Sequence, residues 1–175
     1  MKISVQERNP KNEKAYNLKD FKVLTIDDFP FITELIEGTL RQMGVEQVLS
    51  ANSGEQGRNL ILQNNKIANS YNNLDVVILD WLMPELDGAA LLKWIREQEA
   101  ETIKFLPVIV CSAFASSDLV AQARDLGASE VLVKPLSAEK LANRIQHVIE
   151  HPRPFVKTAD FFGPNRRRKS EDFKK

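Results

Sequence analysis

The sequence VVILDWLMPELDG, residues 76–88, decides the fold of this chain. It begins with an uninterrupted aliphatic run, reaches a carboxylate at Asp80, and continues through Pro84 to Asp87 and Gly88. A short run that is apolar at every position is typical of a strand buried on both faces, as in a parallel sheet covered by helices. We therefore predict a central strand that ends at Asp80, and a helix that begins near Gly88 with Asp87 as its N-cap.

Apolar runs alternate with amphipathic segments along residues 21–151. Five runs rich in β-branched and aliphatic residues are expected to be strands, at 21–28, 45–51, 74–80, 105–113 and 129–134. The segments that follow them have helical spacing and are expected to be helices, at 30–44, 53–64, 87–98, 116–128 and 137–151. Ser53 and Ser137 are predicted N-caps, and Gly44 and Gly127 are predicted helix ends. This pattern predicts a doubly wound α/β fold, with five helices around a five-stranded parallel sheet.

Two terminal segments lie outside this alternation. Residues 1–20 are polar without a sustained period, and we expect them to be flexible. Residues 152–175 contain three prolines and eight basic residues against three acidic ones, and they have no helical or strand period. The predicted organisation is therefore a flexible segment, a domain over 21–151, and a basic, aromatic-containing tail that is either disordered or a docking motif for a partner.

The composition narrows the class of protein. The formal net charge is zero, so no overall field favours nucleic acid or a membrane. Cys111 is the only cysteine, which rules out an internal disulfide and favours a reducing compartment. No apolar run approaches the roughly 18 residues that a membrane helix needs, and the N-terminus lacks the apolar core of a signal peptide. We expect a cytoplasmic protein.

Polar side chains follow four of the predicted strands. Asp27 and Asp28 end the first strand, Asp80 the third, Ser112 the fourth and Lys134 the fifth. In an open α/β sheet, ligands bind at the carboxyl ends of the strands, so these groups are expected to meet.

Three neighbouring carboxylates repel one another unless a cation such as Mg²⁺ offsets their charge. A carboxylate can also act as a nucleophile and form an aspartyl-phosphate, for which Lys134 supplies a positive charge and Ser112 a hydroxyl donor. A cis bond before Pro135 would fix the turn that aims the lysine.

The motifs IDD, LDWLMPELDG, VCSA and VLVKP occur in that order on this alternation. Together they resemble the receiver domain of two-component response regulators, over about residues 20–150. The segment DWLMPELDGAALLKWIR is especially similar to the one around the phosphoacceptor of the single-domain chemotaxis response regulator. The resemblance implies a flavodoxin-like sheet with strand order 2-1-3-4-5.

The resemblance implies roles at the acidic end of the sheet. Asp80 would be the phosphoacceptor and also a Mg²⁺ ligand, and Asp28 would bind Mg²⁺ directly. Asp27 would bind the ion through water or act as a supporting acid, and the backbone carbonyl of Leu82 would be a further ligand.

The resemblance also implies a source for the phosphoryl group. It would come from a sensor histidine kinase, a phosphotransferase or a small phosphodonor, and Ser112 and Lys134 would bind it on the receiver. The domain would assist its own phosphorylation and dephosphorylation without being an enzyme for a separate substrate.

Four features depart from the family pattern. Leu82 and Phe114 are apolar at the two positions that flank the attacking water, which predicts slow self-dephosphorylation. Val131 stands where the family usually has an aromatic residue, so the usual coupling of a hydroxyl to an aromatic switch is in question. Residues 64–73 contain an insertion of about eight residues, expected to be a surface loop.

The tail carries the stretch FFGPNRRRK, residues 161–169. Phe161 and Phe162 precede a run of cations that includes Arg166, Arg167 and Arg168. This stretch is either a solubilising tail, a motif that docks a partner or folds back on the domain when Asp80 is phosphorylated, or a phosphate-backbone binder.

We interpret the chain as a stand-alone receiver whose output is phosphorylation-controlled binding of a downstream protein, with neither a membrane nor a nucleic acid as its expected partner. Two alternatives stay open: a degenerate receiver that acts as a constitutive scaffold, and a nucleic-acid binder that uses the basic tail. A Mg²⁺-dependent phosphatase fits less well, because its nucleophile normally lies in a DxD arrangement and Asp80 is followed by Trp81 and Leu82.

Overall fold

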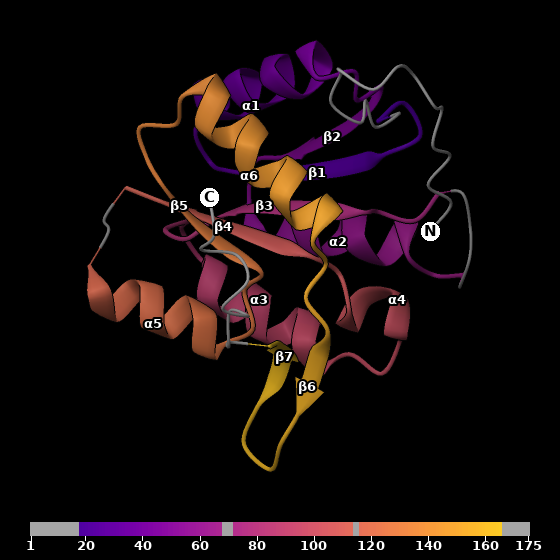
Figure 1. The fold of residues 1–175 in the computed structure, drawn as a ribbon, viewed down its shortest axis with the longest axis vertical. Helices are drawn as coiled ribbons and strands as arrows, with labels where there is room; N and C mark the ends of the chain where they lie inside the picture. Colours follow the sequence, from indigo (N-terminus) through magenta and orange to yellow (C-terminus); the bar gives the residue numbers. More distant parts are fainter. Residues whose placement is uncertain (1–17, 68–71, 114–115, 166–175) are drawn as a thin grey trace, which may run out of the picture.

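The computed structural model describes residues 18–67, 72–113 and 116–165. Five parallel strands form one sheet in the order β2-β1-β3-β4-β5 (Figure 1), which confirms the predicted doubly wound topology. The strands are β1 (Lys22–Ile26), β2 (Gln47–Ala51), β3 (Val76–Asp80), β4 (Val108–Ser112) and β5 (Glu130–Val133). Strand β3 lies between β1 and β4 and is buried at all five positions, as its continuous apolar sequence predicts.

The described residues contain six helices, whereas the sequence predicted five. They are α1 (Pro30–Gln42), α2 (Gly54–Asn64), α3 (Gly88–Glu97), α4 (Glu101–Lys104), α5 (Ser117–Asp125) and α6 (Ala138–Glu150). The additional helix is α4, whose four residues are too few to produce a helical period in the sequence.

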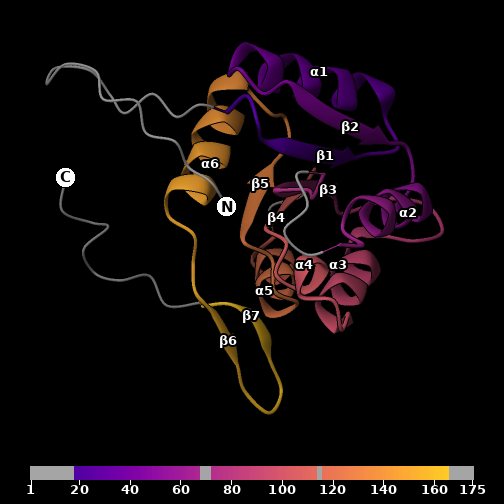
Figure 2. The same ribbon diagram turned by 90° about the vertical axis from the view of Figure 1, so that its right-hand side faces the viewer.

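The helices cover both faces of the sheet. Helices α1 and α6 lie together on one face, and α2, α3 and α5 lie on the other (Figure 1 and Figure 2). Neighbouring residues of β1 point to opposite faces, so Val23 shares a core with Leu40 of α1, while Leu24 shares a core with Leu91 of α3. The sheet is therefore the middle layer of three, and only its ends are open to ligands.

The predicted helix ends are confirmed. Ser53, Asp87 and Ser137 each accept a hydrogen bond from the backbone N–H three residues further on. Gly44 and Gly127 follow α1 and α5 with φ angles of +90° and +93°, a conformation that glycine adopts without strain.

The predicted insertion follows α2, and part of it, residues 68–71, lies outside the described residues. Its first residue after the helix, Asn65, is buried and donates to the carbonyl of Thr102 in α4, whose hydroxyl donates to the carbonyl of Asn65. These bonds fasten the start of the insertion to α4.

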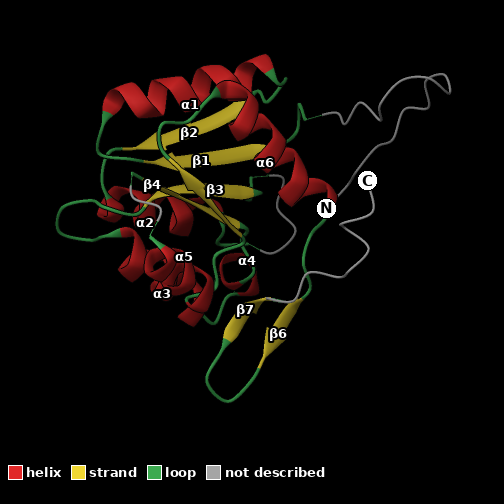
Figure 3. Ribbon diagram, turned by 60° about the vertical axis from the view of Figure 1, so that its left-hand side comes forward, coloured by secondary structure: helices red, strands yellow, loops and turns green. Residues whose placement is uncertain are grey.

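The expectation that the tail lacks regular structure is wrong for residues 155–164. Strands β6 (Phe155–Lys157) and β7 (Phe162–Pro164) pair antiparallel and form a hairpin that projects beside α3 and α5 (Figure 3). Strands of three residues carry almost no alternation, so the sequence pattern could not reveal them. Their stability comes from packing of Phe155 and Phe162 against Phe105, which precedes β4.

None of the helices in the described ranges is both long and apolar enough to cross a membrane. The N-terminal segment predicted to be flexible lies outside these ranges, apart from its last three residues.

Candidate functional site

The carboxyl ends of the strands bring together the polar residues that the sequence singled out. The Nζ atom of Lys134, which follows β5, lies 2.6 Å from Oδ2 of Asp27 after β1 and 2.9 Å from Oδ1 of Asp80 at the end of β3. The three side chains are 15%, 2% and 6% exposed, respectively, so little water screens the two ion pairs. Asp28 adjoins them, and Ser112 ends the neighbouring strand β4, where it is almost fully buried.

The backbone around Asp80 is held by a close turn. The N–H of Trp81 donates to the carbonyl of Cys111 in β4, and the N–H of Gly88 donates back to the carbonyl of Trp81. A Cβ atom at Gly88 would collide with the carbonyl oxygen of Asp80, so glycine is required where α3 begins against the end of the strand. Within this turn Glu85 adopts a left-handed φ of 64°. The segment 76–88 therefore holds Asp80 at the edge of the sheet.

Burial and the neighbouring charges have opposing effects on the pKa values of Asp80 and Lys134. Burial raises the pKa of Asp80 above its ordinary 3.8, and the neighbouring charge of Asp27 adds to this, while the hydrogen bond from Lys134 partly offsets it. Burial alone would lower the pKa of the Lys134 ammonium. Its hydrogen bonds to Asp27 and Asp80 outweigh burial, so its pKa lies above the ordinary 10.5.

The acidic residues fit a divalent cation. Asp27, Asp28 and Asp80 each offer a carboxylate oxygen, and these oxygens lie within 4.8 Å of one another. Oδ1 of Asp28 is buried and has no hydrogen-bond partner within the described parts of the chain. Because an unpaired buried carboxylate oxygen is costly, and Mg²⁺ prefers oxygen ligands, this arrangement is compatible with magnesium.

The remaining predicted site residues have different surroundings, and one of them is not described. Leu82 is 54% exposed in the loop after β3, and Val131 is half-buried in β5 against the α2–α3–α5 core. The Lys134–Pro135 peptide bond is cis, the isomer that would fix the turn carrying Lys134. Phe114 lies outside the described residues.

Two of the predicted docking residues of the tail, Phe161 and Phe162, lie at the other end of the sheet (Figure 1). Phe161 and Phe162 belong to the hairpin, which packs against Phe105 and Gly127, the residues that precede β4 and β5. Arg166, Arg167 and Arg168 fall outside the described residues.

The sequence analysis did not single out two exposed aromatic residues near the acidic centre formed by Asp27, Asp28 and Asp80. Phe29 and Phe31, at the start of α1, are 65% and 73% exposed, and the N–H of Phe29 donates to Oδ1 of Asp27. Their exposure could have been predicted from the sequence, because Phe29 and Phe31 fall outside the apolar stripe of α1.

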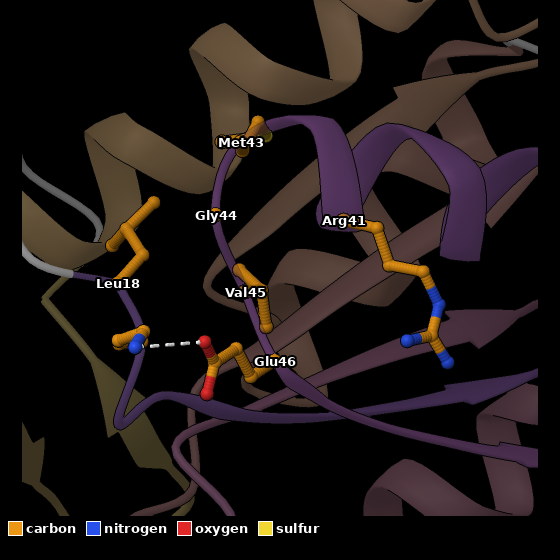
Figure 4. A pocket seen from close by; sticks show the side chains of 7 residues that line it. Leu18, Arg41, Met43, Gly44, Val45 and Glu46 are labelled. Carbon is orange, nitrogen blue, oxygen red and sulfur yellow. Dashed lines mark ion pairs between the residues drawn. The ribbon is translucent and has the colours of Figure 1, made fainter.

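A shallow pocket lies away from this centre. It has a volume of about 520 Å³ and is formed by the end of α1 and the segments that precede β1 and β2 (Figure 4). Lys19 and Glu46 form an exposed ion pair at its edge, and Arg41 points outward from the helix. Glu46 is the one carboxylate among the described residues that line it, so it differs from the group formed by Asp27, Asp28 and Asp80.

The chain belongs to the response regulator receiver family. Residues 23–146, well over half of the chain, match the family described as "Response regulator receiver domain". Receiver domains are phosphoacceptor signalling domains of bacterial two-component systems rather than enzymes for a separate substrate. They bind Mg²⁺ at an acidic cluster, and CheY-like receivers interact with histidine kinases and downstream targets.

Known proteins resemble the chain over most of their own length. The "Chemotaxis protein CheY" of Pseudomonas aeruginosa is 30% identical over 129 residues, which cover 74% of this chain and 96% of that protein. The "Chemotaxis protein CheY-3" of Vibrio cholerae is 29% identical over 132 residues, which cover 75% and 94%.

Solved structures agree with this assignment. The chemotaxis protein CheY4 of Vibrio cholerae has a TM-score of 0.62 at 29% identity, over 73% of this chain and 98% of that one. A receiver domain protein of Clostridium thermocellum has a TM-score of 0.63 at 32% identity, over 74% and 94%. The resemblance that the motifs implied is therefore confirmed at the level of the family and the fold.

Proposed function

We propose that this chain is a response regulator that accepts a phosphoryl group on Asp80 in a Mg²⁺-dependent reaction. Its output is phosphorylation-controlled binding of another protein. The observation that carries the proposal is the position of Lys134, within 2.9 Å of Asp80 and 2.6 Å of Asp27, in a cluster that also contains Asp28. These contacts support the proposal, because the reaction needs a carboxylate nucleophile, a positive charge and oxygen ligands for a hard cation close together.

The phosphoryl group comes from a histidine kinase or phosphotransferase. An ionised oxygen of Asp80 forms a bond to phosphorus while the bond between phosphorus and the donor's imidazole nitrogen breaks, and the imidazole keeps the electron pair. Lys134 exchanges its hydrogen bond with Asp80 for one with a phosphoryl oxygen, and the hydroxyl of Ser112 donates to another. Asp27, Asp28, Asp80 and the carbonyl of Leu82 would hold the Mg²⁺ ion, which would supply positive charge to the transferring phosphoryl oxygens.

The protein target binds the face formed by α5, β5 and α6. Val120 of α5 and Val133 of β5 are more exposed than most apolar residues of the described chain, which supports a protein-binding role. The relatives described above are chemotaxis proteins, so chemotaxis is one candidate pathway for this output.

Self-dephosphorylation is proposed to be slow. Leu82 is exposed beside the phosphorylation site and carries no polar group that could orient an attacking water. Phe114 is apolar as well. A phosphorylated lifetime of seconds after removal of the phosphodonor would contradict this part of the proposal.

Intact mass spectrometry tests the proposal most directly. Purified protein is incubated with Mg²⁺ and acetyl phosphate, beside the variants Asp80→Ala and Asp75→Asn. Asp75 is a matched control, because its carboxylate precedes the same strand at the opposite end and accepts a hydrogen bond from the N–H of Lys22. One added phosphoryl group is expected on wild type and Asp75→Asn and none on Asp80→Ala.

If neither wild type nor the variants take up a phosphoryl group, even from a histidine phosphodonor, the constitutive-scaffold alternative is favoured. The nucleic-acid alternative depends on Arg166, Arg167 and Arg168, which lie outside the described residues. Salt-dependent binding to duplex DNA or RNA would support it.

A further inference from the structure

The C-terminal hairpin is attached to the receiver at the end of the sheet opposite Asp80. The match to the receiver family ends at residue 146, so the hairpin at 155–164 lies beyond it. Figure 1 and Figure 2 show the hairpin below the sheet, beside α3, α4 and α5. Three sets of contacts attach it.

The first contact joins two backbones. A Cβ atom on Gly163 in β7 would lie 2.8 Å from Cα of Gly127, and a Cβ atom on Gly127 would lie 3.0 Å from the carbonyl oxygen of Phe162. Side chains at either position would push the two segments apart. The hairpin therefore docks directly on the turn that ends α5.

The second contact is an aromatic cluster over a buried arginine. The rings of Phe155, Phe162 and Phe105 lie with centroids 4.9 to 5.5 Å apart. The guanidinium of Arg96 lies 5.1 Å from the ring centroid of Phe155 and donates two hydrogen bonds to the carbonyl of Gly127. The same arginine thus links α3, the end of α5 and the hairpin.

The third contact is an ion pair at the start of β5. Arg153, just before the hairpin, lies 2.8 Å from Glu130, whose other carboxylate oxygen is 3.2 Å from Arg144 of α6. The side chain of Glu130 is 7% exposed, so the acidic partner of both pairs is buried, whereas the arginines are partly exposed. The segment that leads into the hairpin is therefore fixed to the first residue of β5.

Both elements that the hairpin holds lead to the phosphorylation site. Strand β5 runs from Glu130 to Val133, and Lys134, which pairs with Asp80, follows immediately. Helix α5 begins five residues after Ser112 and ends at the turn that contacts the hairpin. One short element, α5 or β5, therefore lies between each of Ser112 and Lys134 and the contacts with the hairpin.

We propose that the β6–β7 hairpin is a regulatory clamp on α5 and β5, whose docking is coupled to phosphorylation of Asp80. This inference rests on the proposed function. The docked hairpin stabilises the present arrangement of both elements and opposes the rearrangement that accommodates a phosphoryl group. Because such coupling is reciprocal, phosphorylation must loosen the hairpin, and loosening the hairpin must favour phosphorylation.

The rate of Asp80 labelling by acetyl phosphate and Mg²⁺ tests the coupling, with Gly163→Ala as the variant that undocks the hairpin. Lys157→Ala is the matched control, because Lys157 is exposed in the same hairpin and takes no part in the three contacts. We expect labelling about fivefold faster in Gly163→Ala than in wild type or in Lys157→Ala. Far-UV circular dichroism confirms that each variant is folded.

Hydrogen exchange of the wild-type chain is the second readout and needs no variant. The N–H groups of Thr158 and Asn165 are bonded to the carbonyls of Phe161 and Pro154, so both report on the hairpin. Their exchange is expected to accelerate when acetyl phosphate and Mg²⁺ are added to wild type, and to stay unchanged in Asp80→Asn.

A wild type that takes up no phosphoryl group would overturn the proposed function, and the clamp with it. The clamp alone would be overturned by a different result. In that case wild type takes up the phosphoryl group at least as fast as Gly163→Ala, and hydrogen exchange at the hairpin does not change on phosphorylation.

Discussion

Replacing Lys134 by methionine should lower the free energy of unfolding by about 3 kcal/mol at neutral pH without Mg²⁺. The ammonium lies 2.6 and 2.9 Å from two carboxylates that are 2% and 6% exposed. Its removal leaves the charges of Asp27 and Asp80 close together with no positive group between them. Breaking a buried ion pair by removing one partner costs about 3–5 kcal/mol, and the 15% exposure of the lysine places this case at the lower end.

The pH dependence of this loss of stability follows from the direction in which the fold shifts the pKa of Lys134. The pKa of Lys134 is raised above 10.5, so the fold favours the charged ammonium. Its contribution is therefore fully present below the ordinary lysine value and is lost as the pH rises through the raised value. The difference between wild type and Lys134→Met should be constant from neutral to mildly alkaline pH and should shrink above 10.5.

Urea unfolding followed by the fluorescence of the two tryptophans, the buried Trp81 and the partly buried Trp94, measures the loss. The matched control is Lys93→Met, because Lys93 forms an ion pair of 3.8 Å with Glu97 in which both side chains are more than 60% exposed. The control should change stability by less than about 0.5 kcal/mol. A loss below about 1 kcal/mol in Lys134→Met, or one equal to the control, would refute the reasoning.

Three further predictions concern the end of the sheet and its core. Gly88→Ala should destabilise the fold by roughly 2 kcal/mol, because its Cβ collides with backbone atoms of Asp80, whereas Gly38→Ala in open space on α1 should stabilise it by up to about 1 kcal/mol; thermal unfolding of both variants compares them. Asp80→Asn should raise stability at neutral pH without Mg²⁺, because burial raises the pKa of Asp80, and this gain should disappear as the pH falls through the raised value toward 3.8; a gain independent of pH in urea unfolding would contradict this. Burial raises the pKa of the Cys111 thiol to about 12, so iodoacetamide should alkylate it only after unfolding, and rapid alkylation of the native chain, followed by mass, would show that the thiol is accessible.

Local sequence was sufficient for the sheet and for most of the site. Strand β3 is apolar at each of its first four positions, which is typical of a strand covered on both faces. Polar residues at the ends of β1, β3 and β5 were predicted to meet because parallel strands end at a common edge, and Asp27, Asp80 and Lys134 do meet there. The helix N-caps were predictable as well, because Ser53, Asp87 and Ser137 accept hydrogen bonds from backbone N–H groups only three residues further along the chain.

Tertiary structure decided the features that depend on contacts between distant segments. Helix α4 and the β6–β7 hairpin are too short to leave a period in the sequence, and they are held by residues such as Asn65 and Phe105. The pairing of Lys134 with Asp27 joins residues 107 positions apart. Gly127 was predicted as a helix end, but its second role, as the surface on which Gly163 docks, needed the packed structure. The physical reason is the same in each case: a periodic pattern records which face of an element is buried, whereas the partner that buries it is determined only when the chain is folded.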